Sequence, residues 1–106
     1  MEGSISERLA RTRARSRRLR DQKIREAMVA NNGRLTCEVP GCGFDFFETY
    51  GELGRGFAHV HHVRLLARNG RTKTAVKDLK VVCANCHAMI HIGGKCRRLQ
   101  EIHIHR

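Results

Sequence analysis

The sequence predicts a small α+β domain that is stapled by a metal ion and preceded by a basic N-terminal helix. Three observations lead to this prediction. A chain of 106 residues with 41% apolar residues has a thin core for one domain. Two pairs of closely spaced cysteines offer the ligands of a structural metal ion. Short β-forming segments precede a short helical segment, and the first 30 residues are rich in arginine.

The first expected element is the basic helix. Ser4-Ile5-Ser6-Glu7 fits a capping box, and Asn31-Asn32-Gly33 supplies a stop signal. Apolar positions are sparse, so we expect only the half from Leu19 to Ala30 to pack on a core. The arginine-rich first half is expected to be looser and to order on contact with phosphate. We divide the chain into a basic helical arm over 1–34, a domain over 35–93 and a basic tail over 94–106.

The elements after the arm are short. Cys37 to Gly43 predicts a tight knuckle, because Pro40 and two glycines allow sharp turns. A helical turn is expected from Asp45 to Glu48, followed by a loop from Gly51 to Gly56. The remaining expected elements are a strand over 57–63, a basic loop over 64–77, a strand over 79–82 and a helix over 84–92 that Gly93-Gly94 ends.

The net charge of +11 and the pI near 10.5 predict a polyanionic partner, because phosphate contacts release counterions. Nucleic acid is the expected partner, and an anionic membrane surface is the weaker alternative. The arginine-rich segment could instead serve only as a solvated face. The residues expected to contact phosphate are Arg13, Arg15, Arg17, Arg18, Arg20, Arg64, Arg68, Arg71 and Lys73.

Five cysteines without a signal peptide or an apolar run that could span a bilayer indicate a reducing compartment. We therefore expect a cytoplasmic protein whose thiolates bind metal. The expected structural zinc ligands are Cys37, Cys42, Cys83 and Cys86, and the alternative is that they are buried free thiols. Cys96 is left over and is expected to be a free spectator thiol.

Histidines indicate a second centre. His87 and His91 are four residues apart, so a helix puts both imidazoles on one face. The His61-His62 pair precedes them in the first expected strand. Two alternatives stand beside this interpretation: one of the helical histidines could complete a Cys-Cys-His-His zinc site, and the pair could be a solvated strand end.

These motifs together, two cysteine pairs, a double histidine and Cys-His-x-x-x-His, make residues 35–91 resemble a stand-alone HNH endonuclease of the ββα-metal, or His-Me finger, class. The resemblance implies a zinc-stapled ββα-metal core. It also implies that His62 is the general base that activates water. It assigns a divalent ion to His61, His87 and His91. Asp78 matches the family's middle Asn and is counted with His62 as catalytic.

The chemistry of phosphodiester hydrolysis fits these roles. The reaction needs a base with a pKa near neutrality, and imidazole at about 6.5 is the natural one. It also needs a cation that neutralises the developing charge. An ion held by three neutral histidines keeps positions for a phosphate oxygen and water, whereas a four-cysteine ion is closed. The thiolate site is therefore expected to fold the domain and the histidine site to react.

Three positions depart from the family pattern. His59 occupies the place of a common acidic residue and could add a ligand, contact phosphate or raise the positive charge. Asp78 can accept but cannot donate hydrogen bonds, so it keeps the loop-bracing role of the Asn only in part. Leu65 stands where a Pro is usual.

We therefore predict a metal-dependent DNA endonuclease. It is expected to be a monomer that nicks one strand of duplex DNA with low sequence specificity and does not associate with membranes. Its expected cofactors are a structural Zn²⁺ and a catalytic divalent ion, which is Mn²⁺, Co²⁺, Ni²⁺ or Mg²⁺. The alternatives are a zinc-finger-like nucleic-acid-binding module without catalysis and an RNA-cleaving relative.

Overall fold

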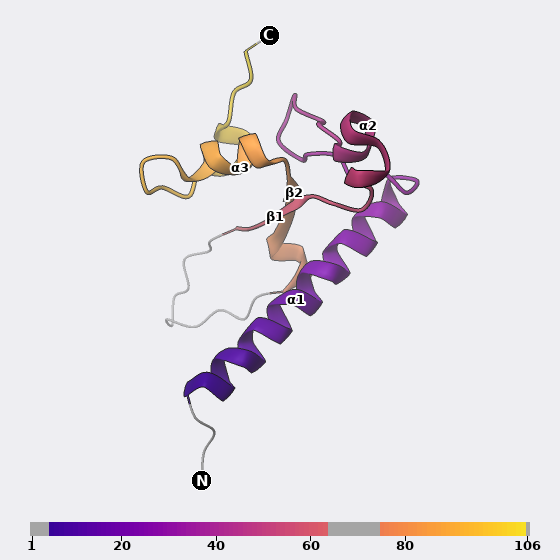
Figure 1. The fold of residues 1–106 in the computed structure, drawn as a ribbon. Helices are drawn as coiled ribbons and strands as arrows, with labels where there is room; N and C mark the ends of the chain where they lie inside the picture. Colours follow the sequence, from indigo (N-terminus) through magenta and orange to yellow (C-terminus); the bar gives the residue numbers. More distant parts are fainter. Residues whose placement is uncertain (1–4, 64–74, 106) are drawn as a thin grey trace.

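A computed structural model of the chain describes residues 5–63 and 75–105 (Figure 1). In this part of the chain, three α-helices surround one two-stranded antiparallel sheet, which confirms the small α+β fold. The helices and strands are α1 (Ile5–Ala30), α2 (Phe46–Tyr50), β1 (His59–His62), β2 (Leu79–Val82) and α3 (Ala84–His91). Three 3₁₀ turns span Gly51–Gly54, Val76–Asp78 and Leu99–Glu101.

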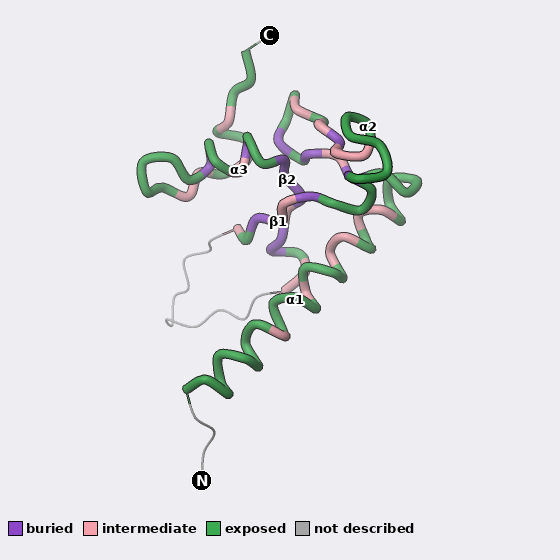
Figure 2. The backbone as a smooth tube through the Cα atoms, viewed as in Figure 1, coloured by how far each residue is buried: buried purple, intermediate pink, exposed green. Residues whose placement is uncertain are grey.

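Helix α1 runs along one side of the molecule, and its second half lies against the sheet (Figure 1). Its 26 residues make a rod of about 39 Å. It ends as predicted, since the N–H of Gly33 donates to the carbonyl of Met28 at 2.7 Å and Gly33 has a φ of +83°. Half-buried positions gather in its second half, at Leu19, Lys23, Ile24, Ala27 and Met28 (Figure 2).

The first half of α1 is also helical from Ile5 onward, so the expectation of a looser arginine-rich start is wrong for the described residues. The residues between Ile5 and Ala30 include no Gly or Pro. Arginine, alanine and leucine have high helix propensities, so the segment continues the helix without a core beneath it. The expected cap residue, Ser4, lies outside the described residues.

The strand register divides the sheet into two faces. His59 pairs with Val82, Val60 with Val81, His61 with Lys80 and His62 with Leu79. Paired residues point to the same side of a sheet, and successive residues alternate. Val81 packs against Ile24, Ala27 and Met28 of α1, whereas Val82 packs with Cys86 and Ile90 of α3. His59 and His61 therefore share the face that α3 covers, and Val60 and His62 share the face toward α1.

The buried apolar residues form two clusters, one on each face. Leu35, Ala58 and Val81 make the smaller cluster under α1. The larger cluster lies between the knuckles and α3 (Figure 2) and contains Cys37, Val39, Val82, Cys83, Cys86 and Ile90. Leu99 and Ile102 pack against this larger cluster, so the segment after α3 is partly anchored to the core.

Glu38 joins three elements. Its N–H donates to the carbonyl of Val81 at 2.8 Å, and its carboxylate accepts the N–H of Val81 at 2.7 Å. The same carboxylate pairs with Lys23 of α1 at 3.2 Å. The exposed edge of β2 is thereby satisfied by the first knuckle segment, and the arm is tied to the sheet.

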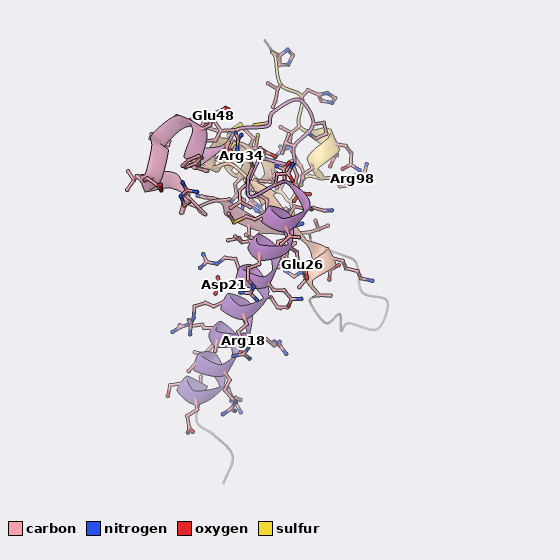
Figure 3. All side chains as sticks on the ribbon, turned by 90° about the vertical axis from the view of Figure 1, so that its right-hand side faces the viewer. Arg18, Asp21, Glu26, Arg34, Glu48 and Arg98 are labelled. Carbon is pink, nitrogen blue, oxygen red and sulfur yellow. The ribbon has the colours of Figure 1, made fainter. Side chains whose placement is uncertain are left out.

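Helix α2 begins at the predicted turn. The buried carboxylate of Asp45 caps it by accepting the N–H of Phe47 at 2.8 Å, and it also accepts Arg34 Nε at 2.6 Å. Burial alone would raise the pKa of Asp45, but the Arg34 guanidinium and the two N–H groups outweigh it and lower that pKa. Arg34 also pairs with Glu48 at 3.2 Å, and Figure 3 labels both side chains.

The expected loop from Gly51 to Gly56 is partly a 3₁₀ turn, over Gly51–Gly54. Gly54 is buried against α2, and a Cβ there would collide with the carbonyl of Phe46. This close approach explains why the turn is built with glycine. In the described part of the chain, no helix is long and apolar enough to span a bilayer.

Candidate metal centres

The four cysteines from the two knuckles converge on one point. The Sγ atoms of Cys37, Cys42, Cys83 and Cys86 all lie within 4.8 Å of one another. Cys42 Sγ is 3.8 Å from Cys83 Sγ, which is too far for a disulfide at about 2.05 Å. Tetrahedral zinc with Zn–S bonds of about 2.3 Å separates two sulfurs by about 3.8 Å. The cluster therefore fits a structural zinc ion.

Local backbone geometry aims these thiols inward. Gly41 has a φ of +83° and Gly43 of +69°, a conformation that glycine adopts freely. The N–H of Cys37 donates to the carbonyl of Phe44 at 2.9 Å, which closes the first knuckle. In the second knuckle, Cys83 caps α3, and its Sγ accepts the N–H of Cys86 at 3.4 Å. Both knuckles thus form where the sequence predicts them.

The pKa values of these thiols indicate that the group needs a cation. Burial raises the pKa of Cys37 to about 11 and raises that of Cys86 further. Burial acts in the same direction on Cys83, but hydrogen bonds from Cys86 and the other thiols outweigh it and lower the pKa of Cys83. Crowded buried thiols cannot all ionise by themselves, and a bound dication offsets their combined charge.

A second group is made of histidines only. One ring nitrogen each of His61, His87 and His91 lies within 4.8 Å of the others. Strand β1 positions His61, which is 2% exposed, and one turn of α3 separates the other two. Among the described residues, this group holds no carboxylate. Three neutral imidazoles fit a borderline divalent ion and leave at least one coordination position for another ligand.

Neighbouring groups orient the histidine rings. His59 Nδ1 lies 2.9 Å from His87 Nδ1, and His91 Nδ1 lies 3.0 Å from the carbonyl of Lys95. A carbonyl can only accept, so His91 donates through Nδ1 and keeps its Nε2 lone pair for an ion. By the same logic, an Nδ1 donor on His87 would leave its Nε2 available. His59 was expected to add a ligand, contact phosphate or raise the positive charge, and the structure instead places it against the His87 ring.

His61 and His87 are both held in the neutral form. Burial, followed by the charges of His91, His87 and His62, lowers the pKa of His61 to about 4. Burial and the neighbouring His59 and His91 also lower the pKa of His87. Metal ions bind neutral imidazole, so near neutral pH little proton competition opposes binding at these two residues.

No protein-family model, curated protein or solved structure matches this chain. The candidate sites therefore rest on their own geometry and chemistry.

His62 lies on the other side of β1 from His61. It is exposed and lines a hollow of about 250 Å³ between the strand and α1. Arg15 and Arg20 of α1 line the same hollow, together with Leu19 and Val60. The structure therefore separates His62 from the histidine group and brings it to two of the arginines expected to contact phosphate.

Asp78 closes the base of the segment between the strands. Its buried carboxylate accepts the N–H of Ala75 at 2.9 Å, and its carbonyl accepts the N–H of Val63 at 2.8 Å. These bonds need only acceptors, so a carboxylate can serve where the family pattern has an Asn. Asp78 is thus a brace that fixes the end of β1.

The arginines expected to contact phosphate divide among several places. Arg13 and Arg17 are exposed and one turn apart, and neither is among the residues that line the hollow. Arg18 is also exposed, and Figure 3 shows it on the part of α1 that extends from the domain. The remaining four, Arg64, Arg68, Arg71 and Lys73, lie outside the described residues.

Sequence reasoning missed two residues beside the histidines. Lys80 is half-buried and pairs with His61, so it shares the histidine face of the sheet. Cys96 places its Sγ 3.9 Å from His61 Nε2, although it was expected to be a spectator. Strand alternation could have indicated Lys80 once the register was known. Cys96 follows a double-glycine turn, and its place depends on how that turn folds.

Proposed function

We propose that the protein is a metal-dependent phosphodiesterase of the HNH type that nicks DNA. The observation that carries this proposal is the all-histidine group, whose three donor atoms would leave a coordination position on a bound ion, on a chain of net charge +11. A structural metal site would gain nothing from an open position, whereas a hydrolytic site requires one. The positive charge favours a polyanionic substrate.

The ion would bind through His61, His87 and His91, and when bound it would polarise a phosphate oxygen and offset the charge that develops on the phosphate. His59 and the carbonyl of Lys95 would keep two of the rings in place. Lys80 would add positive charge on the same face of the sheet. The cysteine group would hold the knuckles and take no part in the reaction.

His62 is the proposed base. Its neighbours Arg15 and Arg20 would hold the substrate phosphate in the hollow beside it. Strand β1 ends at His62, so a phosphodiester that lies across the end of the strand would reach the hollow on one side and the ion on the other. The same proposal includes a zinc-stapled ββα-metal core and an enzyme that acts as a monomer and nicks one strand.

One observation favours a different function. Because His62 and the histidine group lie on opposite sides of β1, the chain could instead be a nucleic-acid-binding module with two structural ions. Such a module would bind DNA or RNA with a strong salt dependence and cut neither. Cleavage of RNA by the same site is the remaining alternative, since the phosphate chemistry is shared.

A plasmid assay tests the proposal. Supercoiled DNA with Mn²⁺ should pass through an open-circular form before linear product appears, and Mg²⁺ should support slower nicking, because imidazole ligands suit transition ions better. His62→Ala should lower the nicking rate by about 10²–10⁴-fold with unchanged zinc content and DNA affinity. His103→Ala, in the exposed C-terminal segment, is the matched control and should keep full activity.

The outcomes separate the alternatives. Tight binding of the plasmid without nicking, with every metal, would identify the binding module. Retention of more than about a tenth of the rate in His62→Ala would remove His62 as the base while leaving the metal site in place. Faster cleavage of a matched RNA strand would indicate the RNA-cleaving relative.

A further inference from the structure

Cys96 lies at the edge of the histidine group. Its Sγ is 3.9 Å from His61 Nε2, and the ring nitrogens of His61, His87 and His91 lie within 4.8 Å of one another. In a tetrahedral site with a Zn–S bond of about 2.3 Å and a Zn–N bond of about 2.0 Å, sulfur and nitrogen are about 3.5 Å apart. The separation of Cys96 from His61 is therefore close to that of two ligands of one ion, and the thiol has to move toward His87 and His91, because it lies outside the group whose ligand atoms are all within 4.8 Å of one another.

The backbone after α3 holds Cys96 in this place. Gly93 and Gly94 have φ values of +78° and +73°, which turn the chain back over the end of the helix. On one side of Cys96, the carbonyl of Lys95 accepts His91 Nδ1 at 3.0 Å. On the other side, the N–H of Arg97 donates to the carbonyl of Ile90 at 3.0 Å.

The Arg97 side chain strengthens this turn. Its guanidinium donates to the carbonyls of Met89 at 3.1 Å and Ile92 at 2.7 Å, which are free at the end of α3. Both neighbours of Cys96 are thus fixed to the helix that carries His87 and His91. The thiol is half-buried, and the residues on both sides of it are bonded to α3.

We propose that Cys96 is the fourth ligand of a three-histidine, one-cysteine site that selects Zn²⁺ and similar thiophilic ions. On binding, the sulfur–metal bond replaces the S–H bond, and the proton leaves to the buffer. A thiolate is a soft ligand, so Zn²⁺ and Co²⁺ gain the fourth bond, whereas Mg²⁺ and Mn²⁺ gain little from it. The same histidines would then hold a closed site with zinc and an open one with harder ions.

This inference deepens the proposed function, on which its catalytic consequence rests. A closed four-ligand sphere has no position for phosphate or water, so Zn²⁺ would inhibit nicking that Mn²⁺ supports. Cys96 would thereby make the site responsive to available zinc and to the oxidation state of its own thiol. The ligand assignment itself can be tested without any cleavage assay.

The test uses Co²⁺ as the probe on full-length protein whose cysteine group already holds one equivalent of Zn²⁺. In the wild type, the added Co²⁺ should give a near-ultraviolet sulfur-to-cobalt charge-transfer band and visible bands typical of tetrahedral cobalt. Cys96→Ser should lose the charge-transfer band and bind Zn²⁺ at this site at least about tenfold more weakly, while Mn²⁺ affinity stays unchanged. Zn²⁺ should protect the Cys96 thiol from alkylation.

Lys95→Ala is the matched control, because it keeps the thiol and the backbone carbonyl that holds His91. It should retain the charge-transfer band. A charge-transfer band that persists in Cys96→Ser would come from cobalt in the cysteine group and would overturn the assignment. Binding of Co²⁺ without a band would do the same and leave the nuclease proposal standing. A wild type that binds no second ion would overturn both.

Discussion

The cysteine group and the histidine group meet in α3, where Cys86 belongs to the first and the adjacent His87 to the second, and they differ in how completely their donor atoms could surround an ion. Three of the four cysteines are buried, and they belong to the larger apolar cluster. Of the histidines, only His61 is fully buried, and the donor set is one short of a tetrahedron until Cys96 is included. A closed thiolate site stabilises the fold, and an incomplete imidazole site is free to exchange ligands.

The difference shows how a small chain can separate stability from chemistry. A zinc ion bound by the cysteines would supply much of the folding free energy of a domain with so thin a core, since a structural zinc ion supplies about 10–16 kcal/mol in small domains. The histidines lie on β1 and α3 and, unlike the cysteines, are not part of the apolar clusters. Each of the following predictions tests whether the cysteines stabilise the fold and the histidines carry the chemistry.

The largest effect is expected for Cys83→Ser. Loss of the zinc-binding free energy exceeds the whole stability of a typical domain, which is about 5–15 kcal/mol, so the variant should be unfolded and zinc-free. Circular dichroism and metal analysis measure this. Cys96→Ser makes the same chemical change outside the cysteine group and should remain folded with one zinc ion. A folded Cys83→Ser variant would show that the apolar clusters suffice.

His91→Ala should remove the second metal site and the proposed nicking activity while sparing the thermal transition in zinc-replete buffer. Its ring contributes a ligand atom and one bond to the Lys95 carbonyl. Calorimetric metal titration, thermal unfolding and the plasmid assay measure the three quantities on one sample. If His91→Ala and Cys83→Ser unfold the protein equally, a single shared site is the better description.

A smaller effect is expected from two arginine pairs of equal charge. Replacing Arg15 and Arg20 by Gln should lower the nicking rate at saturating DNA, since both line the hollow beside His62. Replacing Arg13 and Arg17 by Gln should leave that rate unchanged. Each lost phosphate contact should reduce the salt slope of DNA binding by about 0.9, in either pair. Equal rates for the two double variants would remove the hollow from the proposed substrate site.

The smallest effect concerns pH. Burial lowers the pKa of His61 to about 4 from its ordinary 6.5, so the unfolded chain binds more protons between these values. The free energy of unfolding should therefore fall as the pH drops from about 6.5 toward 4. His61→Gln should flatten this dependence in urea titrations, whereas His103→Gln should not. An unchanged slope in His61→Gln would mean that groups other than His61 set the acid sensitivity.

Much of this division could be predicted from the sequence. Both knuckles, the helix that presents His87 and His91, and the two strands lie where spacing and β-propensity predict them, because each depends on residues close together in the chain. The start of α1 was misjudged, since propensity alone continues a helix that has no apolar stripe. The 3₁₀ turn over Gly51–Gly54 depends on close packing against Phe46, which is a tertiary contact.

The candidate site was predicted less completely. That His61 joins His87 and His91 requires only that β1 face α3, and the resemblance implied it. The position of His62 beside Arg15 and Arg20 depends on where a distant helix docks, which local patterns do not contain. Lys80 and Cys96 became visible only through the strand register and the turn after α3.

The register of β1 and β2 makes the chain far more sensitive to insertions than to substitutions. A change at Val60 or Lys80 alters one face of the sheet, but one extra residue ahead of His59 would turn every later side chain of β1 to the opposite face. The imidazoles of His59 and His61 would then point toward α1, and His62 toward α3. The four residues of β1 therefore decide which side chains face α1 and which face α3. Insertions and deletions in natural or engineered versions of this chain should avoid this strand.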